Sequence, residues 1–226
     1  LVLDGCVQPA LAPNINAATA RVLDKLGITL IKAQEAGCCG AVTYHLNAQQ
    51  EGLDYMRRNI DAWWPFIEHD KAEAIVITAS GCGATVKDYG HLLQHDEKYA
   101  GKAARISALA KDVSEVLNAE LEHIQHRMDQ QNIGSDRMKL SFHSPCTLQH
   151  GMQIRGLVEK ILTTVGFDLT HVPNAHLCCG SAGTYSILQP KLSQQLLKNK
   201  VQALESGQPD QVATANIGCL MHLQGG

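Results

Sequence analysis

The sequence has 226 residues, a length that fits one large domain or two small ones and that buries a core without disulfides. It contains 19 lysines and arginines against 22 aspartates and glutamates, and a net charge of -3 argues against a nucleic-acid partner. The longest apolar runs, such as residues 74–77, are far shorter than the roughly 20 residues of a membrane span, so no transmembrane segment is expected. Aromatic residues make up only 4% of the chain, which favours α/β packing of small aliphatic side chains.

Hydrophobic patterning predicts alternating strands and helices in the first half of the chain. The elements expected there are a strand at 1–3, a helix at 17–26, a strand at 28–31, a helix at 41–69 interrupted at Pro65, and a strand at 74–79. Cys38-Cys39-Gly40 falls between the second strand and the long helix, and Cys82 follows the last strand.

The second half repeats this order. Its expected elements are a strand at 138–142, a helix at 156–165, a strand at 169–172, a helix at 191–204 and a strand at 212–215. Strands that alternate with helices pair in parallel through right-handed crossovers. We therefore expect an α/β fold of two pseudo-symmetric, Rossmann-like halves with short parallel sheets, at 1–95 and 137–226, joined by a polar helical connector at 96–136.

The eight cysteines form two sets with the same spacing. In each set 31 residues separate a lone cysteine from a Cys-Cys-Gly element. A fourth cysteine follows the element's second cysteine, with 42 intervening residues in the first set and 39 in the second. The two Cys-Cys-Gly elements lie 140 positions apart. The two sets are Cys6, Cys38, Cys39 and Cys82, and then Cys146, Cys178, Cys179 and Cys219.

Every cysteine is expected just after the carboxyl end of a parallel strand, at or before the start of a helix. That edge of an open α/β sheet is where ligands bind, and a helix amino terminus favours thiolate over thiol. Four thiolates that converge from neighbouring strand ends suit a metal or an iron–sulfur cluster. Core packing of small apolar side chains, copied by duplication and now without a ligand, is the alternative.

Three of the eleven histidines lie near cysteines and are candidates to touch a bound metal. His143 precedes Cys146 by three residues, His176 precedes Cys178 by two, and His222 follows Cys219 by three. Of these, His222 is predicted as a metal ligand along with the eight cysteines.

The chain resembles the cysteine-rich CCG domains of the heterodisulfide reductase B subunit and of the iron–sulfur subunits of anaerobic glycerol-3-phosphate dehydrogenase and lactate-utilisation complexes. It is most similar to the iron–sulfur subunits of glycolate oxidase, and the likeness covers essentially the whole chain. The segments that carry it are DGCVQP at 4–9, NAATARVLD at 16–24, YHLNAQ at 44–49, NIDAWWP at 59–65 and CCGSAGTY at 178–185.

This resemblance implies an iron–sulfur electron-transfer subunit of a glycolate-oxidising complex, that is, part of an oxidoreductase that is inactive alone. The expected cofactor is a cluster of the [4Fe-4S] type held by the eight cysteines. FAD is expected on flavoprotein partner subunits, the acceptor is a membrane quinone, and the location is cytoplasmic, on the inner face of the cell membrane.

The sequence departs from the family pattern in two places. The full subunit carries C-x2-C-x2-C-x3-C-P runs for cubane clusters, and this chain has none. The heterodisulfide reductase motif ends in C-x2-C, whereas Thr85 follows Cys82 at that position and His222 follows Cys219.

Two other functions stay open on the sequence. Four cysteines per half also satisfy tetrahedral zinc, so a structural zinc-binding or empty-site scaffold that mediates subunit assembly is the main alternative. A thiol–disulfide enzyme is less favoured, because adjacent cysteines form strained bridges and no C-x-x-C begins a helix.

Overall fold

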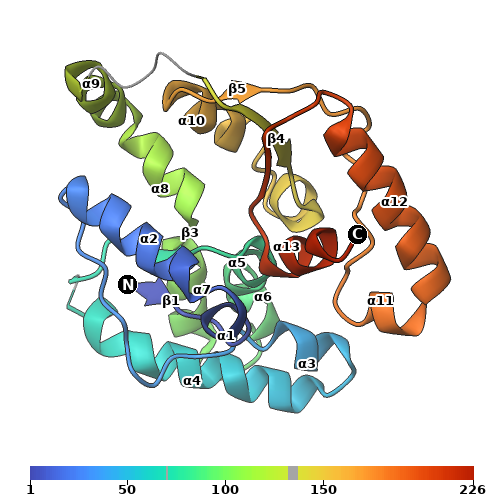
Figure 1. The fold of residues 1–226 in the computed structure, drawn as a ribbon. Helices are drawn as coiled ribbons and strands as arrows, with labels where there is room; N and C mark the ends of the chain where they lie inside the picture. The colour runs from blue at the N-terminus through green and yellow to red at the C-terminus, as the bar shows by residue number, and fades with distance from the viewer. Residues whose placement is uncertain (70, 132–136) are drawn as a thin grey trace. The chain divides into compact units, whose positions relative to one another are not determined.

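The computed structural model describes residues 1–69, 71–131 and 137–226 (Figure 1). It divides the chain into two compact units, Leu1–Val116 and Leu117–Gly226. Each unit contains one parallel sheet of three short strands with helices between them. The expected α/β class with short parallel sheets is confirmed.

The first unit has the strand order β1-β2-β3. Its elements are β1 (Val2–Leu3), α1 (Gln8–Leu11), α2 (Pro13–Lys25), α3 (Ala41–His45), α4 (Gln49–Ile67), β2 (Ile75–Ile77), α5 (Ser80–Lys87), α6 (Tyr89–Leu92), α7 (Ala100–Leu109), β3 (Ala110–Asp112) and the first residues of α8 (Val113–Ala119). The strand expected at 28–31 is reduced to one bridge between Val2 and Lys32 and to a hydrogen bond from the Val2 amide to the Ile31 carbonyl, 3.1 Å long.

The second unit has the strand order β5-β4-β6. Its elements are α9 (Leu121–Gln131), β4 (Lys139–His143), a π-helical turn η1 (Thr147–Gly151), α10 (Leu157–Thr164), β5 (Asp168–Leu169), α11 (Tyr185–Leu188), α12 (Pro190–Glu205), β6 (Gln211–Thr214) and α13 (Ile217–Gln224). The strands expected near 138–142, 169–172 and 212–215 are all present within a few residues of their expected bounds.

The strand pair β1–β2 of the first sheet and the pair β4–β6 of the second share their register, although the full strand orders differ. Strand β3 has no counterpart in the second sheet, and β5 corresponds to the single bridge at Lys32 in the first unit. Leu3 pairs with Ile77 in the first unit, and His143 pairs with Thr214 in the second. His143 lies 140 residues after Leu3 and Thr214 lies 137 after Ile77, which are the offsets of the cysteines that follow these strands. The repeat predicted from cysteine spacing is therefore a repeat of backbone structure.

Helix α4 supplies much of the first core. Met56, Ile60 and Trp63 have no exposed surface, and they belong to one apolar cluster with Ile75 and Ile77 of β2. The helix continues through Pro65 to Ile67, so the expected interruption at Pro65 is wrong. The break falls earlier, where Asn47 takes a φ of 69° between α3 and α4, because that conformation cannot continue an α-helix.

The segment expected as a connector, 96–136, is divided between the units. Ala103, Ile106 and Leu109 form a buried stripe on α7 inside the first core. The strand that follows, β3, pairs with β2 and completes the first sheet. Only α9 and part of α8 then lie in the second unit, and residues 132–136 lie outside the described part of the chain.

The glycine after the first cysteine pair sits where no side chain fits. Gly40 has a φ of +85°, and a Cβ on it would lie 2.5 Å from the Gly52 carbonyl oxygen of α4. Gly40→Ala should therefore lower the free energy of unfolding by at least about 2 kcal/mol, from left-handed strain plus overpacking. Urea denaturation of the metal-free chain followed by tryptophan fluorescence measures this for the first unit alone, because both tryptophans, Trp63 and Trp64, lie there.

Gly101→Ala is the matched control for this prediction. Gly101 lies in the first turn of α7, its φ is not positive, and a Cβ there would meet nothing within 4 Å. Its substitution should change stability by less than about 1 kcal/mol. Equal urea midpoints for the two variants would contradict the steric account of Gly40.

Candidate metal centres

Each unit brings its four cysteines to the carboxyl edge of its sheet. Cys6 and Cys146 each come three residues after the end of a strand, β1 and β4. Cys82 and Cys219 are each the third residue of the helix, α5 or α13, that follows the neighbouring strand. Within a unit these two cysteines follow adjacent parallel strands and so lie at one edge of the sheet. The Cys-Cys-Gly elements do not directly follow a strand, contrary to the expectation: Cys38 comes six residues after the bridge at Lys32, and Cys178 comes nine residues after β5.

The Cys-Cys-Gly element of each unit lies against a helix further along the chain, α4 in the first unit and α12 in the second. The Gly40 amide lies 3.5 Å from the Cys38 sulfur, and the Gly180 amide lies 3.3 Å from the Cys178 sulfur. Gly180 repeats the geometry of Gly40, with a φ of +97° and a missing Cβ that would lie 2.6 Å from the Ser193 carbonyl oxygen. The glycine therefore lets the backbone approach the helix and aims an amide at the first sulfur of the pair.

In the first unit the four thiols form a row of neighbours. Cys6 contacts Cys38, Cys38 contacts Cys39, and Cys39 contacts Cys82 through side-chain hydrogen bonds. The Cys39 contact and then burial raise the pKa of Cys38. The pKa of Cys39 rises to about 12: its contact with Cys38 favours the thiolate, but its contact with Cys82 and burial outweigh that effect.

The second unit repeats this row from Cys146 through Cys178 and Cys179 to Cys219. Contacts with Cys146 and then Cys179 lower the pKa of Cys178, and the same sulfur raises the pKa values of those two neighbours. A contact with Cys179 lowers the pKa of Cys219 to about 6, against burial and with help from His143.

The thiols of each row lie close enough for each to affect the ionisation of its neighbour. Four thiolates this close together repel one another, so all four ionise together only beside a positive metal centre. In the described part of the chain, which includes all eight cysteines, none forms a disulfide. Thiolate sulfur is the donor preferred by iron–sulfur clusters and by zinc, so the donor chemistry of both rows fits such a group. The described residues whose ligand atoms lie within 4.8 Å of one another as a group of three are His143, Cys179 and Cys219 of the second unit.

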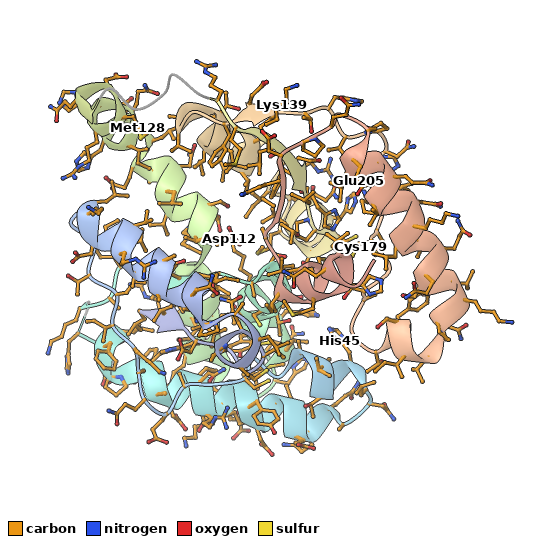
Figure 2. All side chains as sticks on the ribbon, viewed as in Figure 1. His45, Asp112, Met128, Lys139, Cys179 and Glu205 are labelled. Carbon is orange, nitrogen blue, oxygen red and sulfur yellow. The ribbon has the colours of Figure 1, made fainter. Side chains whose placement is uncertain are left out.

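The histidines expected near the cysteines occupy different places. His143 lies with Cys179 and Cys219 in a group whose possible ligand atoms are all within 4.8 Å of one another; Cys179 is labelled in Figure 2. His222 has its Nε2 3.3 Å from the Ser193 hydroxyl oxygen. His176 is exposed, and its carbonyl oxygen lies 3.2 Å from His150 Nε2.

Sequence reasoning missed a buried cation beside the second site. Lys200 of α12 is only 3% exposed, and its ammonium group donates to the carbonyl oxygens of Asn174 and Ala175 at 3.3 and 3.2 Å. Burial lowers the pKa of Lys200, while its electrostatic attraction to all four cysteines of the second unit opposes this shift. The Lys200 ammonium group is therefore within electrostatic range of all four of these sulfurs.

The first unit has a neutral side chain at the matching place. Buried positions of α4 recur in α12 141 residues later, and at this spacing Asn59 corresponds to Lys200. Asn59 is fully buried, donates to the Cys38 carbonyl at 2.9 Å and accepts from the Gly37 amide at 2.8 Å. One side chain supports the Cys-Cys-Gly loop by hydrogen bonds alone, and the other adds a charge.

Fold and site together define a duplicated α/β protein with a row of four neighbouring thiols in each repeat. The chain belongs to the cysteine-rich domain family, whose model matches it twice, at residues 1–87 and 140–224.

Named relatives match the sequence over nearly the whole chain. The glycolate oxidase iron-sulfur subunit of Escherichia coli (strain K12) is 58% identical over 99% of the chain and 53% of its own length. The probable glycolate oxidase iron-sulfur subunit of Bacillus subtilis (strain 168) is 30% identical over 97% of the chain and 48% of its own length. Lactate utilization protein A of Anoxybacillus flavithermus is 28% identical over 97% of the chain and 88% of its length. The chain therefore spans about half the length of the first two relatives.

Metal titration tests whether each unit forms its own centre. Cobalt(II) added to the reduced, metal-free chain should give sulfur-to-metal charge-transfer absorption that saturates at about two ions per chain, with release of thiol protons. Cys39→Ser should remove the first-unit site and leave about one ion bound, and Cys179→Ser should do the same for the second. Complete loss of cobalt binding in either single variant would contradict two independent centres.

Proposed function

We propose that this chain is the electron-transfer part of the iron–sulfur subunit of a glycolate-oxidising complex. The observation that carries this proposal is the pair of four-thiol centres, each built at the carboxyl edge of a parallel sheet. The names of the relatives at 58% and 30% identity support glycolate oxidase as the complex. The lactate utilization relatives support a related role in the oxidation of a 2-hydroxy acid.

In this proposal the eight cysteines are the ligands of clusters of the [4Fe-4S] type. A bound iron–sulfur cluster supplies one-electron redox chemistry. The chain's own part is to hold the thiolates, to direct the Gly40 and Gly180 amides at sulfur, and to keep Cys39 and Cys179 buried from water. His222 stays a predicted ligand. Its Nε2 lies 3.3 Å from the Ser193 hydroxyl oxygen.

The remaining parts of the proposal concern partners and location. Electrons would come from FAD on flavoprotein partner subunits and pass towards a membrane quinone. Among the described residues, no helix combines the length and apolarity needed to cross a bilayer. The proposal accordingly treats the chain as a cytoplasmic protein bound peripherally at the inner face of the membrane.

A structural zinc protein is the second candidate, because four neighbouring thiols also satisfy tetrahedral zinc. Zinc has no redox role, so metal and sulfide analysis of anaerobically purified protein separates the two candidates. Iron with inorganic sulfide and visible absorption supports electron transfer, and stoichiometric zinc without visible absorption overturns it.

Removing one buried thiolate should stop electron delivery without unfolding the chain. Serine is close to cysteine in size, but its oxygen is a poor substitute for thiolate towards iron. Cys39→Ser or Cys179→Ser, made in the full-length subunit within the complex, should abolish glycolate-dependent reduction of a quinone analogue. Reduction of a dye that accepts electrons directly from the flavin should continue and serves as the control. Unchanged quinone rates in both variants would leave a structural role only.

The buried charge of Lys200 predicts a further difference between the centres. A cation stabilises the more negative, reduced state of a neighbouring cluster, so Lys200→Met should lower the reduction potential of the second centre. Lys198→Met is the control, because Lys198 is exposed on the same helix and solvent screens its charge. Potentiometric titration of the two variants checks this, and equal potentials would show that the Lys200 charge does not act on the centre.

A further inference from the structure

His143 is buried beside sulfur. Only 1% of its surface is exposed, and neither ring nitrogen makes a hydrogen bond of normal geometry to a described residue, so its polar contact is with the Cys219 thiol. A buried polar group left without such a hydrogen bond costs about 1–3 kcal/mol. A protein that keeps such a group gains something from it that packing does not provide.

The sheet holds the imidazole close to two sulfurs. His143 is the last residue of β4, and its backbone is fixed by parallel pairing with Thr214 of β6. One ring nitrogen, the Cys179 sulfur and the Cys219 sulfur lie within 4.8 Å of one another. Cys179 is also buried, with 1% of its surface exposed. Three donors that metals prefer therefore meet here, two of them buried and Cys219 partly exposed.

The first unit shows that the fold does not require a histidine here. The matching residue is Leu3, which lies at the same register position of β1, is 2% exposed and packs in the apolar core. Leucine there satisfies the packing at no polar cost. The imidazole in the second unit is therefore explained by ligand chemistry better than by the demands of the sheet.

We propose that one ring nitrogen of His143 is a ligand of the group held by the second unit, together with Cys179 and Cys219. The second centre is then a mixed nitrogen and sulfur site, whereas the first is a site of thiolates alone. The inference rests on the proposed function, since it names a ligand of the cluster proposed there. A neutral imidazole binds through its lone pair and adds no negative charge.

His222 is the competing nitrogen donor. The spacing after Cys219 predicts it as a ligand, but its Nε2 lies 3.3 Å from the Ser193 hydroxyl. Neither ring nitrogen of His143 makes a hydrogen bond of normal geometry to a described residue, and the Cys179 and Cys219 sulfurs lie within 4.8 Å of one of them. The two histidines therefore give a discriminating pair of variants.

The experiment uses the full-length subunit with Cys39→Ser, which removes the first centre and leaves the second as the source of CCG-domain signals. The protein is labelled with ¹⁵N-histidine and purified anaerobically, and the second centre is set to its paramagnetic state at a controlled potential. Pulsed EPR should show hyperfine coupling to a histidine ¹⁵N. His143→Leu, which copies the first unit, should abolish this coupling, and His222→Gln should keep it.

Several results would overturn the inference. No ¹⁵N coupling at an iron-loaded second centre, or coupling lost in His222→Gln and kept in His143→Leu, would show that His143 is not a ligand. A second centre without iron would overturn the proposed function and this inference together, so the two failures are distinguishable. Hydrogen exchange over residues 138–224 checks that the variant unit is folded, and His143→Met replaces His143→Leu if it is not.

Discussion

The close approach of each Cys-Cys-Gly loop to helix α4 or α12 is the constraint on which both centres depend. At Gly40 and Gly180 the backbone occupies space that any side chain would take, with helix carbonyl oxygens 2.5 and 2.6 Å from the missing Cβ atoms. The helix is in turn anchored to the sheet, in the first unit by the fully buried Trp63. The positions of the Cys-Cys-Gly sulfurs thus follow from backbone packing.

The two units share this packing of loop against helix and differ in two buried residues close to the cysteines. In the first unit these are Leu3 and the neutral Asn59, whose described hydrogen bonds are with backbone groups and Tyr89. In the second unit the matching positions hold His143 and Lys200. Polar residues in a core cost stability, so their presence in one copy and not in the other points to a difference in chemistry and not in folding.

The cysteine spacing correctly predicted that one cysteine follows each of two adjacent parallel strands in each unit, because the ends of such strands share one edge whatever the helices do. Local pattern was less reliable for the helices: it placed a break at Pro65, where the helix continues, and missed the one at Asn47. It also treated β3 as connector, since three residues that include Lys111 and Asp112 carry no strand signal. Lys200 gave no local signal. Its importance appears only when the two repeats are aligned on their helices.

The buried charge is the difference between the centres that acts on their redox states. If both rows of thiols are ionised around identical clusters, each centre carries the same charge from sulfur. Lys200 adds a positive charge near the second centre alone, and a nearby positive charge favours the reduced state, in which the cluster carries one more electron. A neutral imidazole raises a cluster's potential where it takes the place of a thiolate, and a His143 nitrogen added to four thiolates takes the place of none. On the proposed function, the charge of Lys200 is therefore what draws an electron shared between the two clusters towards the second.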